Sequence, residues 1–192
     1  VASAAGPGMF DSPEELLAKI GLGEDARLEL KSVRFRGGVV SGPARDDLAD
    51  ELASMANAAG GVCVLGVDDR TRDIEGIPIE HLDAVESLRR EVCNDSIKPP
   101  LDATIVRMRL PAVTGEPRAV IKVDVPRSPF VHGSPGGYFR RLGSSKRKLS
   151  TELLLRLAQQ RSQALVIRFD EQGVPGTTPR DLDVDRARAF FP

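Results

Sequence analysis

The sequence has no tryptophan, a single tyrosine, no G-x-x-x-x-G-K-[ST] motif and no G-x-G-x-x-G motif that opens a helix. The absence of both glycine-rich motifs leaves no support for the two common nucleotide-binding loops. An excess of charge of one sign is also lacking, because 27 basic and 28 acidic side chains give a formal net charge of -1. A nucleic acid or an anionic membrane would therefore have to be bound by a local basic patch.

Cysteine, histidine and long apolar runs are scarce as well. Cys63 and Cys93 form no C-x-x-C motif, which is typical of a reduced cytosolic protein without structural zinc. We interpret His81 as a packing or surface residue of a helix and His132 as a polar loop residue. Without a signal peptide or a membrane-spanning run, the sequence predicts a soluble, cytoplasmic protein with no membrane partner.

What is present predicts an α/β (α+β) fold with a mixed β-sheet and flanking helices. Apolar positions at helical spacing predict helices over 13–20, 46–59, 79–97 and 150–161. Alternating or continuous apolar runs predict strands over 27–31, 62–67, 102–110, 118–125 and 138–149. We divide the chain into a disordered extension (1–12), one domain (13–160) and a linker that begins a C-terminal part (161–192).

Two helix ends carry clear signals. Ser12 is expected to cap the first helix, with Pro13 at its first position, Glu15 closing a capping box and Gly21 as its stop. After the second helix, a double glycine leads directly into the continuously apolar run VCVLGV. We expect Gly60 to take a left-handed conformation there, and this strand to be central in the sheet.

The first strand carries charged side chains on one face. The period of two places Glu29 and Lys31 on the face opposite to the leucines, and Glu24 must reach that face from the preceding turn. Together with Asp68, which ends the central strand, Glu24 and Glu29 form an oxygen-only set that suits magnesium or manganese, while Lys31 would contact a phosphate. Exposed salt bridges explain the same residues without any catalysis.

A second charged segment, YFRRLGSSKRK, has no acidic residue. Its cations would neutralise phosphates, its serines would donate hydrogen bonds to them, and its tyrosine would stack on an unpaired base. The predicted nucleic-acid-binding residues are Tyr138, Arg140, Arg141, Ser144, Ser145, Lys146, Arg147 and Lys148. The alternative is a solvated strand and turn with an inward-facing Phe139.

Four segments, in this order, resemble a known family: ARLELKS, LASMANAAGGVCVLGVDD, IEGIP and YFRRLGSSKRKLS. Together they are similar to the Schlafen/AlbA-like DNA-binding domain family, over about residues 13–160. The resemblance implies a bacterial member, at the N-terminal side of a longer protein of the divergent-ATPase or transcriptional-regulator type. The tail RFDEQGVPG resembles the segment that leads such members into their C-terminal part.

The resemblance implies three alternatives for function. The first is the nucleic-acid-binding domain of a transcriptional regulator, which binds DNA or RNA through residues 138–148. The second is a magnesium- or manganese-dependent endoribonuclease that cleaves transfer or ribosomal RNA, because the carboxylates used by animal Schlafen proteins are matched by Glu24, Glu29 and Asp68 or Asp69. The third is a dimerising scaffold for an attached C-terminal module. Animal members use two copies of the domain, so the resemblance also implies a homodimer.

Overall fold

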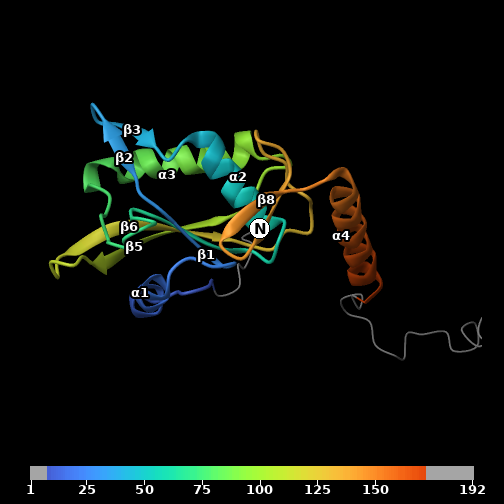
Figure 1. Ribbon diagram of the computed structural model, residues 1–192, viewed down its shortest axis with the longest axis horizontal. Helices are drawn as coiled ribbons and strands as arrows, with labels where there is room; N and C mark the ends of the chain where they lie inside the picture. Colours follow the sequence, from blue (N-terminus) through green and yellow to red (C-terminus); the bar gives the residue numbers. More distant parts are fainter. Residues whose placement is uncertain (1–7, 172–192) are drawn as a thin grey trace, which may run out of the picture.

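The computed structural model describes residues 8–171, which form a mixed four-stranded sheet with helices on both faces (Figure 1). In spatial order the strands are β1 (Leu28–Lys31), β4 (Gly61–Leu65), β6 (Pro117–Val125) and β5 (Thr104–Pro111). β1 runs parallel to β4, and β6 runs antiparallel to both of its neighbours. The predicted mixed sheet with flanking helices is confirmed.

Strand β4 lies between β1 and β6, and all five of its residues are buried. Val62 and Val64 pack into the core on one face of the sheet, whereas Cys63 and Leu65 pack into the core on the other. A strand covered on both faces is expected to be continuously apolar, because neither set of alternating side chains meets water. The predicted central position of this strand is confirmed.

The helices form a layer on each side of the sheet (Figure 1). Helix α1 (Pro13–Leu22) covers one face, and α2 (Arg45–Ala56) and α3 (Leu82–Glu91) cover the other. The helix expected over 79–97 consists of a 3-10 turn, α3 and a π turn, with the two turns at η1 (Ile79–His81) and η2 (Val92–Ser96). Among the described residues, no helix combines the length and apolar character needed to cross a membrane.

Two small hairpins complete the fold. β2 (Arg34–Arg36) pairs with β3 (Val39–Gly42), a hairpin that we did not expect from the sequence. β7 (Phe139–Leu142) pairs with β8 (Ser145–Lys148), where the sequence predicts a single strand. The difference arises at Gly143, which has a φ of 58° and lets the chain reverse.

Helix α1 begins as predicted but ends later. The Oγ of Ser12 accepts a hydrogen bond of 3.1 Å from the backbone N–H of Glu15. The expected stop at Gly21 is wrong, because the helix continues through Leu22. Gly23, with a φ of 88°, ends it and donates its N–H to the carbonyl of Ile20.

The double glycine after α2 has the expected structural role. Gly60 has a φ of 76°, and a Cβ there would lie 2.6 Å from the carbonyl oxygen of Val125. A Cβ on Gly61 would lie 2.7 Å from the carbonyl oxygen of Arg27. Both positions therefore need glycine because neighbouring backbone passes too close for a side chain.

The ends of the described chain differ from the predicted boundaries. Residues 8–12, expected to be a disordered extension, lie against the sheet, where the Nζ of Lys122 donates to the carbonyl of Phe10 over 3.2 Å. Helix α4 (Thr151–Glu171) continues past residue 161, where we expected a linker to begin. The rest of the predicted terminal segments, 1–7 and 172–192, lies outside the described residues.

Candidate nucleic-acid interface

The β7–β8 hairpin divides the predicted basic residues between two faces. Arg140 lies directly opposite Arg147, and Arg141 lies directly opposite Lys146. Since side chains alternate along each strand and directly opposed residues share a face, Arg140 and Arg147 lie on one face and Arg141 and Lys146 on the other. Arg140 and Arg147 are exposed, whereas Arg141 is buried.

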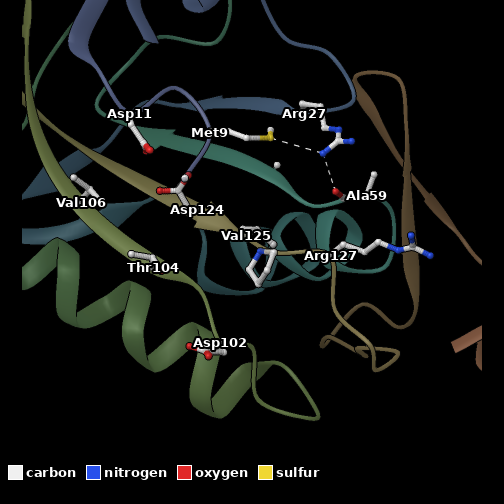
Figure 2. A pocket seen from close by; sticks show the side chains of 13 residues that line it. Met9, Asp11, Arg27, Ala59, Asp102, Thr104, Val106, Asp124, Val125 and Arg127 are labelled. Carbon is white, nitrogen blue, oxygen red and sulfur yellow. Dashed lines mark hydrogen bonds between the residues drawn. The ribbon is translucent and has the colours of Figure 1, made fainter. Parts of the chain in front are cut away.

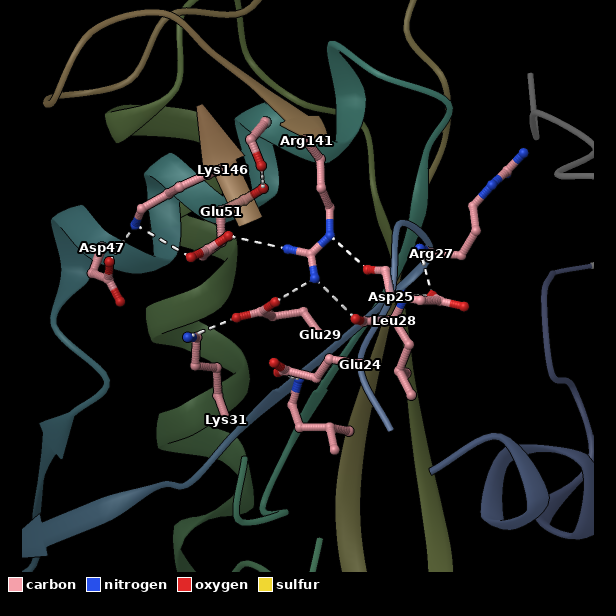
Figure 3. Close-up of polar contacts among 12 residues, drawn as sticks. Glu24, Asp25, Arg27, Leu28, Glu29, Lys31, Asp47, Glu51, Arg141 and Lys146 are labelled. Atoms are coloured by element: carbon pink, nitrogen blue, oxygen red, sulfur yellow. Dashed lines mark hydrogen bonds and ion pairs between the residues drawn. The ribbon is translucent and has the colours of Figure 1, made fainter. Parts of the chain in front are cut away.

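Arg141 points into the protein, where its guanidinium contacts two carboxylates and two backbone carbonyls (Figure 3). Its Nη2 lies 2.6 Å from Oε2 of Glu29, and its Nη1 lies 3.3 Å from Oε2 of Glu51. Nε and Nη2 also donate to the carbonyls of Asp25 and Leu28, over 2.9 and 3.0 Å. The expectation that Arg141 contacts phosphate therefore needs correction, because its donors are used within the fold.

Lys146 shares this inward face and is also ion-paired. Its Nζ contacts Asp47 and lies 3.3 Å from Oε1 of Glu51 (Figure 3). Burial alone would lower the pKa of Lys146, but the hydrogen bond to Asp47 and the two nearby carboxylates outweigh burial and raise it. Lys146 therefore links the hairpin to α2 by ion pairs. The expectation that Lys146 contacts phosphate also needs correction, because its ammonium group is paired within the fold.

The carboxylates of the first strand belong to the same buried network. Glu29 is 3% exposed, and its Oε1 lies 2.7 Å from the Nζ of Lys31. Glu24 does reach in from the preceding turn, where its Oε1 accepts a hydrogen bond from the N–H of Leu30 over 2.8 Å. Burial and the charge of Glu29 raise the pKa of Glu24. We call Glu24, Glu29, Glu51, Lys31, Arg141 and Lys146 the hairpin network.

Asp68 lies elsewhere, in a surface turn after β4. Its Oδ1 accepts the backbone N–H groups of Arg70 and Thr71 over 2.9 and 2.6 Å, and these hydrogen bonds lower its pKa. Within residues 8–171, no group of three or more His, Cys, Asp or Glu side chains is arranged to hold a metal ion. The predicted magnesium or manganese set of Glu24, Glu29 and Asp68 therefore does not fit, because both oxygens of Glu29 contact cations of the protein.

Glu51 is the network residue that sequence reasoning missed. It lies at helical spacing within the buried stripe of α2, between Leu48 and Met55, and is 8% exposed. Burial and the charge of Glu29 raise its pKa. A carboxylate within an apolar stripe is the signal that could have identified it, because such a residue needs a cationic partner.

Two further polar residues hold the hairpin in place. The side chain of Asn57 donates to the carbonyls of His132 and Phe139 over 2.7 and 2.8 Å and accepts from the N–H of His132. His132 lies in a loop, as expected, but its side chain is buried, and its Nδ1 lies 2.8 Å from the carbonyl of Pro99. Burial lowers the pKa of His132, which favours the neutral ring. These contacts give Asn57 a structural role.

Beside the hairpin lies a cleft that the sequence did not indicate. It is lined by β7, the turn after α2 and residues 157–161 of α4, and we call it the basic cleft because Arg127, Arg140 and Arg161 line it. Arg161 is buried and donates to the carbonyls of Asn57 and Ala58 over 3.1 and 3.2 Å. Burial and the charges of Arg127 and Arg140, which line the same cleft, lower the pKa of Arg161.

Comparisons with known proteins give one family. The family model described as Schlafen, AlbA_2 matches residues 24–150. No curated protein matches the sequence significantly. Among solved structures, the DIP2311 protein from Corynebacterium diphtheriae is 22% identical with a TM-score of 0.47, and the similar region covers 77% of this chain and 24% of that one.

Proposed function

Since the chain belongs to the Schlafen AlbA_2 family, we propose that it binds nucleic acid, with the phosphate backbone held on the outward face of the β7–β8 hairpin. One observation carries the proposal. Arg140 and Arg147 lie directly opposite each other on exposed strands, and no carboxylate among the described side chains pairs with either. Like charges in directly opposed positions destabilise a hairpin, so an anion between them would relieve the repulsion.

The basic cleft extends this surface away from the hairpin. Arg127 is exposed and lines the cleft together with Arg140, so their guanidinium groups can contact successive phosphates of one strand. Ser144 and Ser145 are exposed at the hairpin turn, where hydroxyl groups can donate to phosphate oxygens. Tyr138 is 42% exposed and offers a ring for stacking on a base.

The hairpin network has a positioning role in this proposal. Arg141 and Lys146 fix the inward face of the hairpin to β1 and α2, and this fixes the outward direction of Arg140 and Arg147. The proposed contact residues are therefore Arg127, Tyr138, Arg140, Ser144, Ser145 and Arg147. Lys148 lies on the same hairpin face as Lys146, with its Nζ 6.0 Å from the ring centroid of Phe139, so we leave it out of the proposed contacts. We do not propose a metal-dependent endoribonuclease, because Glu24 and Glu29 are used within the network and Asp68 lies apart from them.

The test is a fluorescence-anisotropy titration of labelled single-stranded and duplex DNA and of transfer RNA at several salt concentrations. Arg140→Ala with Arg147→Ala should weaken binding to every nucleic acid that wild type binds. Each lost phosphate contact should make the slope of log affinity against log salt shallower by about 0.9 on duplex DNA and about 0.7 on single strands.

The matched control is Arg36→Ala with Arg109→Ala, which removes two exposed arginines from β2 and β5 and changes the net charge equally. It should leave the affinity and the salt slope close to those of wild type. Equal losses in both double variants would show a general charge effect, and an unchanged Arg140/Arg147 variant would overturn the proposal.

A further inference from the structure

We infer that a pocket beside the basic cleft takes one unpaired nucleotide, with its base inside and its phosphate at the cationic rim. The pocket lies at one end of the sheet, where β1, β4 and β5 begin and β6 ends, and it has a volume of about 700 Å³. This volume falls within the range of about 300–1,000 Å³ that is usual for small-ligand sites. The inference rests on the proposed function, because it places the base next to the strand that the basic cleft holds.

Charge divides the pocket into two sides. Figure 2 shows Arg27 and Arg127 on one side and Asp11 and Asp124 on the other. Part of the wall between them is apolar, with Val106, Val125 and Pro126. An apolar wall with a cationic rim matches a nucleotide, whose base is flat and weakly polar and whose phosphate is anionic.

The pocket and the basic cleft are adjacent. Ala59 and Arg127 line both of them. One NH group of Arg27 donates to the carbonyl of Ala59 over 2.8 Å, which holds this arginine at the rim. A strand whose phosphates contact Arg140 and Arg127 in the cleft therefore reaches the mouth of the pocket with its next nucleotide.

The acidic side of the pocket selects the kind of base. The Oδ2 of Asp124 lies 3.2 Å from the buried Nζ of Lys122, which also pairs with Asp11 over 2.9 Å. The other oxygen, Oδ1 of Asp124, is buried without a hydrogen-bond partner in the described structure. Asp102, which is exposed, adds a third carboxylate to the lining.

Carboxylates are acceptors, so they favour bases that present amino hydrogens on the Watson–Crick edge. Cytosine, adenine and guanine present such hydrogens, whereas thymine and uracil present carbonyl oxygens beside one N–H group. The inferred ligand is therefore an unpaired nucleotide with an amino-bearing base, and a fully paired base is excluded because its edge is already used.

The test uses 12-nucleotide oligo-dC, oligo-dT and a duplex of equal length, each titrated by fluorescence anisotropy. Wild type should bind oligo-dC more tightly than oligo-dT and the duplex. Val106→Phe fills the pocket from an exposed face of β5 and should weaken oligo-dC binding by about tenfold, which is the size expected for losing one held base. Its salt slope should stay unchanged because no phosphate contact is removed.

Val113→Phe is the matched control, since it makes the same substitution at a residue that is 84% exposed in the β5–β6 turn. It should bind all three probes as wild type does, and thermal melts should show both variants folded. Asp102→Asn, at an exposed position of the lining, should narrow the preference for oligo-dC over oligo-dT.

Two outcomes separate this inference from the proposed function. If wild type binds the three probes equally, and Arg140→Ala with Arg147→Ala weakens binding while Val106→Phe does not, the interface stands and the pocket assignment falls. If wild type binds no nucleic acid, both fall. Free dCMP should compete with oligo-dC for the protein, and dCMP that binds without competing would overturn the inference by making the pocket a separate small-molecule site.

Discussion

Arg140 and Arg141 are neighbours in the sequence, yet their side chains lie on opposite faces of one hairpin and serve different purposes. Arg140 is exposed in the basic cleft, whereas Arg141 is 3% exposed and contacts Glu29, Glu51 and two backbone carbonyls. An arginine held by several acceptors in the interior contributes to the fold, and an arginine in solvent remains available to a ligand.

The first prediction compares these two arginines. Arg140→Ala should weaken nucleic-acid binding and leave the free energy of unfolding nearly unchanged, because an exposed charge contributes little to stability. Arg141→Ala should reduce that free energy by about 3–5 kcal/mol, since it removes the buried cation that Glu29 and Glu51 share and the donor to two backbone carbonyls. Urea denaturation and anisotropy on the same preparations measure both effects, and equal stability of the two variants would contradict the assignment.

The second prediction concerns Glu29. Glu29→Gln should lower the free energy of unfolding by about 3 kcal/mol, because the positive charges of Lys31 and Arg141 lose their shared carboxylate. Asp68→Asn is the control, since Asp68 lies in a surface turn away from the hairpin network, and it should melt close to wild type. Chemical denaturation measures the unfolding free energy of both variants. A Glu29 variant as stable as wild type would contradict the role of Glu29 as the buried partner of Lys31 and Arg141.

The third prediction compares a glycine that the backbone conformation requires, Gly60, with one that it does not require, Gly21. Gly60→Ala should destabilise the protein by more than about 1 kcal/mol, because the backbone there has a φ of 76° and a Cβ would meet the carbonyl of Val125. Gly21→Ala lies within α1 with open space around its Cβ, so it should be neutral or stabilise by about 0.4–1 kcal/mol. Thermal melts measure the change in melting temperature of each variant. A decrease of similar size in both variants would contradict the prediction.

The fourth prediction is a pH dependence from His132. Its pKa lies below the ordinary value of 6.5 because burial disfavours the charged ring. The stability that this lowered pKa contributes is complete above pH 6.5 and is lost as the pH falls through the pKa of the folded protein.

His132→Gln should remove this part of the decline in unfolding free energy below pH 6.5, whereas His81→Gln should keep it. The measurement is urea denaturation between pH 7.5 and 5 for wild type and both variants, with the pH range chosen about the ordinary histidine pKa. If the His132 variant loses as much unfolding free energy between pH 7.5 and 5 as wild type does, the pH dependence arises from other groups.

Much of the fold follows from the sequence because its signals are local. The continuous apolar run of β4 specifies a strand covered on both faces, and the cap at Ser12 specifies the start of α1. The exact end of α1 does not follow in the same way, because Gly21 and Gly23 are both able to end a helix and only tertiary packing chooses between them.

The site was harder to predict because its key contacts are not local. The period of two shows that Arg140 and Arg141 lie on different faces, but not which face meets α2 and β1. The same limit applies to the carboxylates, since the spacing brings Glu24 to Glu29 but leaves the position of Asp68 open. Glu51 was missed because its neighbours in the stripe of α2 are apolar and fit a core without it.

The contact of Arg141 with the first strand has a consequence for the kinetics of folding. The guanidinium donates to the carbonyl of Leu28, which is 113 positions away in the sequence. Contacts that close so long a loop tend to form late, after local helices and the β5–β6 hairpin. Loss of the contact should therefore raise the unfolding rate and leave the folding rate nearly unchanged. The chief kinetic effect of the hairpin network is then to slow the unfolding of the native state.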